Sequence, residues 1–389
     1  MKLSKFTGEF QEVMEIDENI HRLVGNLELL AFINPLNIAQ ERKQFFKEKY
    51  KYNPKFKYRK VRFDTYKLHR LFFSQRLKDI DDKVIRDLYK DVVYTYSGMV
   101  QCIETISQPD NRFYFNSLRF YGTPTDKMVE NAKFILHHRE DDESAFAKAE
   151  PQLSTEQAIQ FFEDYKKEYG FNFAIKTSSA MSAAAMVSNK DRALILKKNH
   201  QFSQHQLNVL AHHEIGVHLV TTFNAIEQPL KVFGNGFPNN VETQEGLAVF
   251  AEYMSGNLTV SRLRELAYRV IAADSLIKGN DFTETFNLIH NQYGLDRERA
   301  FNITLRVHRG GGFTKDALYL SGLQKIYNLH QAGESMESLL MGKCSLEYLP
   351  SVKRLQEVGL AKPITYKCKS YNSNNNKDQR VEWILQNLK

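Results

Sequence analysis

The segment from Ser203 to Gly256 limits the possible folds most, because it places histidines and glutamates inside stretches with the periodicity of buried helices. Ser203 can act as an N-cap for the first stretch, with Gln206 as its capping-box partner. Apolar residues then recur at helical spacing, so one face is expected to be buried: Leu207, Leu210, Ala211, Ile215 and Leu219. We therefore expect a buried helix that carries HHEIGVH.

The two histidines of HEIGVH, His213 and His218, are five residues apart. The zinc-protease pattern H-E-x-x-H uses positions i and i+4, which lie about 40° apart around a helix, whereas i+5 lies about 140° away. Two imidazoles at this spacing converge on one ion only if the turn is widened to a π-type turn, which is typical of functional sites. Gly216 lies inside that turn, where a backbone distortion is easiest. We predict an H-E-x-x-x-H site in which Glu214 can reach a metal-bound water.

A second predicted helix, TQEGLAVFAEY, offers the third metal ligand. Glu245 and Glu252 are seven residues apart and share a face, so one can bind the metal while the other supports it. Spacing alone does not choose between them. Gly246 is expected to let this helix pack closely against the first. A helix rich in His and Glu is more often a solvated face, but three ligands and an open position are the pattern of catalytic zinc.

HEIGVH followed by QEGLA resembles the QEGLA-motif metallopeptidases, which include the microtubule-associated tyrosine carboxypeptidases and bacterial tyrosine/phenylalanine carboxypeptidase domains. RVHRGGGFTKDALYLSG, INPLNIAQERKQFF and FNSLRFYGTP look like further blocks of this family, so the resemblance covers roughly residues 30–350. It implies that one Zn²⁺ per chain is held by His213, His218 and Glu245. It also implies that Glu214 is the catalytic base.

The fold expected from this resemblance and from the segment pattern is α+β and α-rich, with a zincin-like metallopeptidase core. We expect a largely helical N-terminal region at 1–150, the metallopeptidase core at 151–350 and a peripheral C-terminal segment at 351–389, with a polar linker near 137–153. FNFAIKT and RALILKK are predicted strands. The second directly precedes the metal helix, which suits an edge strand that a peptide extends by main-chain pairing.

Composition is that of an ordinary globular protein, with 42% hydrophobic and 25% charged residues. Three scattered cysteines are too few for a disulfide framework or a cysteine zinc site and fit a reducing compartment. The first residues lack a signal-peptide core, and no run of about eighteen apolar residues occurs. We therefore expect a soluble, cytoplasmic protein that makes no membrane contact.

The net charge of +7 favours acidic partners, and much of it lies between Lys43 and Arg70, where basic and aromatic residues alternate. Such a run can bind nucleic acid, but no recognised nucleic-acid motif accompanies it. Contact with acidic protein segments is another interpretation. A solvated surface over an apolar layer is the interpretation that we favour.

RVHRGGGFTKDALYLSG is the second candidate for chemistry. A carboxypeptidase must hold a free carboxylate, which arginine does by bidentate pairing, and it must supply a donor to an oxyanion. We expect substrate to be bound by Arg306, Arg309, Lys315 and Tyr319, and the oxyanion donor to be His308, Tyr319 or an arginine; individual roles stay open. The alternative is a glycine-rich helix C-cap whose basic residues neutralise helix-end carbonyls.

These patterns predict a zinc-dependent carboxypeptidase that releases a C-terminal residue from a peptide or protein by metal-activated water attack. The family name implies that this residue is Tyr or Phe. The alternative is a metal-binding regulatory protein or pseudoenzyme that uses the cleft for peptide recognition only, and the intact Glu214 argues against it.

Overall fold

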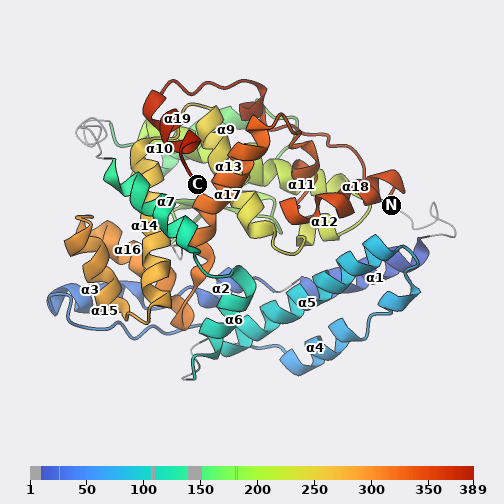
Figure 1. The fold of residues 1–389 in the computed structure, drawn as a ribbon, viewed down its shortest axis with the longest axis horizontal. Helices are drawn as coiled ribbons and strands as arrows, with labels where there is room; N and C mark the ends of the chain where they lie inside the picture. The colour runs from blue at the N-terminus through green and yellow to red at the C-terminus, as the bar shows by residue number, and fades with distance from the viewer. Residues whose placement is uncertain are drawn as a thin grey trace. The chain divides into compact units, whose positions relative to one another are not determined.

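The computed structural model describes residues 10–25, 27–106, 108, 110–138, 151–179, 181 and 183–389. The chain divides into two compact units, and Figure 1 labels their helices. Unit 1 comprises Met1–Leu136 and Arg264–Leu320, and unit 2 comprises His137–Leu263 and Ser321–Lys389. The three-part domain division stays a prediction, and most of the predicted linker near 137–153 lies outside the described residues.

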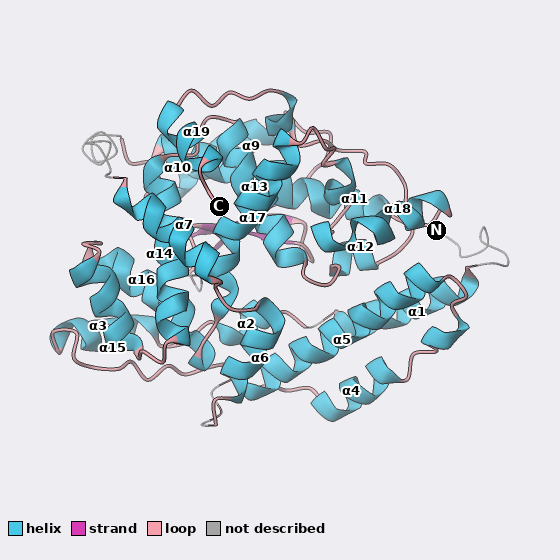
Figure 2. Cartoon of the chain, viewed as in Figure 1, coloured by secondary structure: helices cyan, strands magenta, loops and turns pink. Residues whose placement is uncertain are grey.

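Unit 1 is helical in its described residues (Figure 2). Several of its helices start at an aspartate that satisfies the first free N–H groups; Asp82, for example, accepts from the backbone N–H groups of Val84 and Ile85. The elements are α1 (Gln11–Val24), α2 (Leu29–Ile33), α3 (Ile38–Lys47), α4 (Thr65–Phe73), η1 (Leu77–Asp79), α5 (Lys83–Thr105), α6 (Arg112–Tyr121), α7 (Asp126–His137), α14 (Val260–Ile277), α15 (Phe282–Asn287), η3 (Leu288–Gln292), α16 (Arg297–His308), η4 (Arg309–Gly311) and η5 (Thr314–Ala317). Residues 260–263 of α14 belong to unit 2, and residues 318–320 of α17 (Leu318–Gln331) belong to unit 1. The helical N-terminal part is therefore confirmed.

The basic and aromatic run between α3 and α4 is an extended segment. Its side chains alternate, as they do along any extended chain: the rings of Tyr52, Phe56 and Tyr58 are partly buried. The cations between and beyond them are exposed, namely Lys51, Lys55, Lys57, Arg59, Lys60 and Arg62. This arrangement agrees with a solvated surface over an apolar layer, and the choice between that interpretation and contact with an acidic partner stays a prediction.

Unit 2 contains a three-stranded sheet in the order β1-β3-β2. β1 (Ala174–Ser178) runs parallel to β3 (Ala193–Lys197), with Ala174 opposite Ala193, and β2 (Ala185–Ser188) runs antiparallel to β3, with Ala185 opposite Leu196. The helices are α9 (Thr155–Lys166), α10 (Gln204–Leu210), η2 (Ala211–Leu219), α11 (Val220–Glu227), α12 (Val232–Asn235), α13 (Asn240–Met254), α17 (Leu318–Gln331), η6 (Glu337–Leu340), η7 (Leu346–Tyr348), α18 (Leu349–Glu357), η8 (Lys369–Asn372) and α19 (Gln379–Gln386). The helix-rich α+β class is confirmed.

Two expectations about the sheet are corrected. β3 was expected to be an edge strand, but it lies between β1 and β2 and both of its sides are paired. β2 was not predicted, because it contributes only four residues within a run of small side chains. The edge that borders the metal helix is therefore formed by β2, whose Val187 N–H hydrogen-bonds the Glu214 carboxylate of η2.

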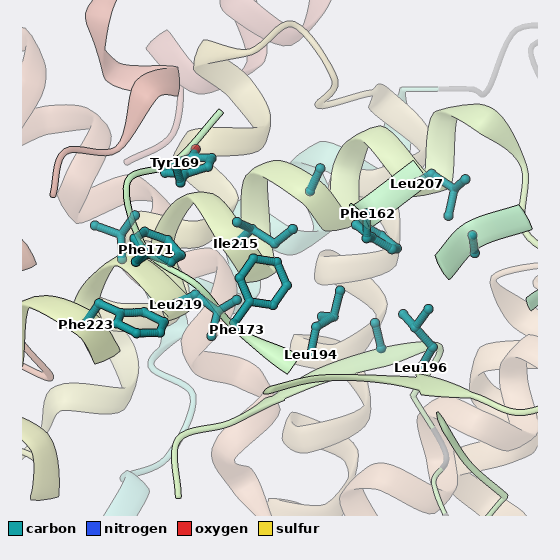
Figure 3. Close-up of a cluster of buried hydrophobic side chains, with 14 of the residues drawn as sticks. Phe162, Tyr169, Phe171, Phe173, Leu194, Leu196, Leu207, Ile215, Leu219 and Phe223 are labelled. Atoms are coloured by element: carbon teal, nitrogen blue, oxygen red, sulfur yellow. The ribbon is translucent and has the colours of Figure 1, made fainter. Parts of the chain in front are cut away.

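The core of unit 2 lies between this sheet and the helices α10 and η2. Figure 3 shows Ile215 and Leu219 of η2 pointing toward the sheet, which presents Leu194 and Leu196. The N-cap at Ser203 is confirmed, since its hydroxyl accepts from the Gln206 N–H at 3.1 Å. Burial of this apolar face therefore fixes how the metal helix is rotated.

Among the described helices, none has the length and hydrophobicity needed to cross a membrane.

Gly246 has a different packing partner from the one expected. A Cβ at this position would lie 2.4 Å from the backbone of Gly322 in α17, and the reverse substitution would meet the carbonyl of Glu242. The glycine pair thus lets α13 cross α17 at backbone contact. The expectation that Gly246 serves the contact with the first metal helix was wrong.

We expect Gly246→Ala to lower the free energy of unfolding by about 2 kcal/mol or more, because two backbones would have to separate. Gly98→Ala in α5 is the matched control, since its added Cβ would meet Phe120 at an ordinary 3.7 Å. The control should gain up to about 1 kcal/mol from helix propensity. Chemical denaturation measures both, and equal stability of the two variants would contradict the close crossing.

Candidate metal centre

The metal helix contains the widened turn that the histidine spacing requires. Residues Ala211–Leu219 form the π-helix η2, inserted between α10 and α11, so the predicted π-type turn is confirmed. It brings the rings of His213 and His218 to the same side, with centroids 5.0 Å apart. A Cβ at Gly216 would make only ordinary contacts of 3.5 Å or more, so this glycine relieves no steric conflict there.

Glu245 of α13 faces both imidazoles. Its Oε2 lies 3.8 Å from His213 Nε2 and 3.8 Å from His218 Nε2. The three ligand atoms lie within 4.8 Å of one another, and the side chains are 9%, 21% and 14% exposed for His213, His218 and Glu245. Tetrahedral zinc with bonds of about 2.0–2.1 Å places its ligand atoms about 3.3 Å apart. The donor set and its spacing thus fit one metal ion.

Glu252 lies behind the triad and is fully buried. It accepts a 2.8 Å hydrogen bond from His213 Nδ1, and Arg262 contacts it through Nε at 3.0 Å and Nη2 at 3.2 Å. Burial alone would raise the pKa of Glu252, but the charge of Arg262 and the bond from His213 lower it. The sequence left Glu245 and Glu252 as alternatives; distance distinguishes them, because only Glu245 faces both Nε2 atoms.

Glu214 lies between the histidines in sequence and is 8% exposed. Burial raises the pKa of its carboxyl, while the charge of His213 and the N–H of Val187 oppose that rise. The Ala184 carbonyl accepts from the Lys197 N–H, so the main-chain groups of Ala184 point toward β3. Along an antiparallel strand, successive residues point their N–H and C=O groups alternately toward and away from the partner strand. The N–H and C=O groups of Ala185 and Val187 therefore face away from β3, and the carboxylate of Glu214 lies against this open edge.

The C-terminal segment contacts both helices that carry the metal ligands. Ser370 Oγ lies 2.9 Å from His212 Nδ1, and the Tyr371 hydroxyl donates to the Leu247 carbonyl of α13 at 2.7 Å. The segment at 351–389, which the sequence suggested was peripheral, therefore packs against the helices of the metal centre. Sequence reasoning missed these contacts because Ser370 and His212 are 158 residues apart and share no motif.

The four residues predicted to bind substrate lie together in a polar cluster of unit 1. Arg306 pairs with the fully buried Asp316 at 2.5 and 2.8 Å. The Lys315 ammonium lies 3.3 Å from the Tyr319 hydroxyl and 5.0 Å from the centre of that ring. Arg309 donates to Asn34. Their roles toward a substrate stay predictions.

His308 of the same segment has a structural partner. Its Nε2 lies 2.8 Å from Thr285 Oγ1, and desolvation lowers its pKa to about 4. The imidazole is therefore neutral in the folded protein at neutral pH.

Comparison with known proteins agrees with this geometry. The family model described as microtubule-associated tyrosine carboxypeptidase matches residues 43–389. The chain belongs to this family. Membership assigns it to the carboxypeptidases, with a peptide or protein as substrate. No individually curated protein matches the chain.

We expect Glu252→Gln to weaken metal affinity roughly 10- to 100-fold, because the partner that orients His213 becomes neutral. Glu242→Gln is the control, since Glu242 lies on the same helix but pairs with Lys325 and Ser321. Competition with a chromophoric chelator for Zn²⁺ measures both variants. Equal affinities would show that Glu252 does not support the site.

We expect acid to destabilise the fold through His308. Its folded pKa of about 4 lies below the unfolded value of 6.5, so the unfolded chain binds more protons between these values. Stability should fall as the pH drops from about 6.5 to about 4. His308→Gln should flatten this part of the profile in thermal melts, and an unchanged slope would contradict a buried neutral imidazole.

Proposed function

We propose that this chain is a zinc-dependent carboxypeptidase that removes an aromatic C-terminal residue, Tyr or Phe, from a peptide or protein. The observation that carries the proposal is the convergence of two imidazoles and one carboxylate beside the buried Glu214. Family membership supports the tyrosine carboxypeptidase activity. The three-ligand site on a distorted helix beside a short sheet supports a zincin-like core.

His213, His218 and Glu245 would hold the zinc, and Glu252 with Arg262 would orient His213. Two nitrogens and one carboxylate oxygen are a donor set of catalytic zinc sites, which keep a fourth position open. Zinc bound there would supply Lewis acidity, which lowers the pKa of a water to about 7 and polarises the scissile carbonyl.

Glu214 would act as the general base. Its carboxylate is fixed by the Val187 N–H and lies in a desolvated pocket, and burial raises its pKa toward the range that suits proton transfer. In this role it accepts a proton from the attacking water and returns that proton to the leaving amine. The fixed position removes the need to order the base during the reaction.

The open edge of β2 would bind the substrate main chain. The outward N–H and C=O groups of Ala185 and the outward C=O of Val187 offer pairing to an extended peptide, while the Val187 N–H stays with Glu214. As binders of the substrate carboxylate we propose Arg306, Arg309, Lys315 and Tyr319, with Arg309 foremost because Arg306 is already paired with Asp316.

The three cysteines are free and buried, which supports our proposal of a cytoplasmic protein.

Metal content and activity together test this proposal. We expect wild type and Glu214→Gln each to hold about one zinc, and only wild type to release C-terminal Tyr or Phe from peptides that end in Tyr, Phe, Glu or Lys. Atomic absorption and mass spectrometry of the peptides measure the two properties. Glu242→Gln, which leaves the carboxylates of the site intact, should retain full activity.

The outcomes separate the alternatives. Zinc binding without cleavage of any peptide would favour the recognition-only interpretation, in which the site binds a chain end without chemistry. Loss of metal from wild type would overturn the assignment of His213, His218 and Glu245. Release of Glu or Lys in place of Tyr would overturn the aromatic specificity alone.

A further inference from the structure

His212 is adjacent to the ligand His213 in η2, but its partners lie on another side of the helix. Its Nδ1 is 2.9 Å from Ser370 Oγ of η8 and 3.3 Å from the Tyr165 hydroxyl of α9. The Tyr165 ring also packs edge-on against the imidazole, with centroids 5.9 Å apart. Because adjacent residues of a helix do not share a face, His212 is held by other segments while His213 faces Glu245.

The next residue of η8 contacts the second helix that carries a metal ligand. The Tyr371 hydroxyl donates to the Leu247 carbonyl of α13 at 2.7 Å, and the Tyr371 ring lies 5.6 Å from the ring of Phe250. Leu247 is two residues from the ligand Glu245. Two consecutive residues of η8, Ser370 and Tyr371, therefore contact the two ligand-bearing helices, each close to a ligand.

The segment around η8 is itself fixed in unit 2. Cys368 is 2% exposed and Ser370 is 5% exposed, and the Tyr371 N–H donates to the Cys368 carbonyl at 3.1 Å. A few residues later, the Asn375 N–H donates to the carbonyl of Met254 at the end of α13, at 2.8 Å. A segment that is attached at several points can restrain the helices that it contacts.

The spacing of the ligands depends on how η2 and α13 are held. Glu245 Oε2 lies 3.8 Å from the Nε2 atoms of His213 and His218, which is longer than a hydrogen bond, so these contacts do not set the distance between the helices. Glu252 bonds His213 to α13 at one point. A second attachment at another point of the π-type turn restricts the rotation that one bond allows.

We propose that η8 is a brace for the metal centre. Ser370 fixes the rotation of the π-type turn through His212, and Tyr371 fixes α13 through Leu247. Both are positioning residues, because neither is a ligand and each acts on the ion through another residue. The inference rests on the proposed function, which supplies the zinc, and it adds that the C-terminal segment sets the affinity of the site.

The zinc affinity of full-length variants, measured by competition with a chromophoric chelator, tests the brace. Ser370→Ala removes the hydroxyl that contacts His212, and Tyr371→Phe removes only the hydroxyl that bonds Leu247. We expect each change to weaken zinc binding roughly 3- to 30-fold, the scale on which residues act on a site through others. The double variant should bind zinc about as weakly as the weaker single variant, because a brace detached at one end no longer fixes the spacing.

Cobalt supplies a readout that a merely structural role would not change. Transition metals adopt geometries that depend on their ligands, and the visible absorption of protein-bound Co²⁺ reports that geometry. We expect Ser370→Ala to shift this absorption relative to wild type.

Ser373→Ala and Tyr366→Phe are the matched controls from the same C-terminal segment. The Ser373 hydroxyl is exposed and donates to Asn375 at 3.3 Å, and Tyr366 contacts two phenylalanine rings through its own ring, which the substitution keeps. Both controls should retain the wild-type zinc affinity and the wild-type Co²⁺ spectrum.

Thermal melts of the metal-free proteins separate positioning from stability. The inference is overturned if Ser370→Ala and Tyr371→Phe melt at lower temperatures but keep the wild-type zinc affinity and Co²⁺ spectrum. It is also overturned if the two losses of affinity multiply in the double variant, since the two bonds would then act independently. Failure of the proposed function looks different: wild type would hold zinc and cleave no peptide, while the brace variants would still bind zinc more weakly. A wild type that binds no zinc would overturn the metal centre and the brace together.

Discussion

The widened turn of η2 is the constraint on which the metal centre depends. In a regular helix His213 and His218 would point about 140° apart, and no single ion could contact both. The π-helical turn instead brings their ring centroids to 5.0 Å. A π-helix is not stable by itself, so tertiary contacts must hold it. Its apolar side packs on the sheet, while His213 is bonded from behind by Glu252.

The support of His213 continues into a third helix. Glu252 is buried and would destabilise the fold if it were unpaired, but Arg262 at the start of α14 neutralises it. The chain Arg262–Glu252–His213 thus connects the orientation of one ring to the packing of three helices. The same ring contacts Glu245 with its other nitrogen, so the electrostatic support and the candidate metal position lie on opposite sides of one imidazole.

Buried charge is handled differently in unit 1. Arg306 and Asp316 form a direct ion pair in which the carboxylate is fully buried and the guanidinium is mostly buried. Glu252 is likewise buried and paired. Arg309, a few residues away in the chain, contacts a neutral amide and an aromatic face, and among the described residues it forms no ion pair with a carboxylate. Within one short segment the protein therefore contains one arginine that pairs directly with Asp316 and another that feels the charge of Asp316 without a direct ion pair.

Local spacing in the sequence determined the helices, the caps, the strands at Ala174 and Ala193, and the need for a π-type turn at HEIGVH, because each depends on residues close in the chain. Tertiary structure alone decided three matters. Glu245 and Glu252 share a helix face, and only the fold shows that Glu245 faces both Nε2 atoms while Glu252 pairs with Arg262 of another helix. The edge position went to β2 because strand order depends on pairing between segments. Gly246 meets Gly322 because helix crossings join residues far apart in sequence.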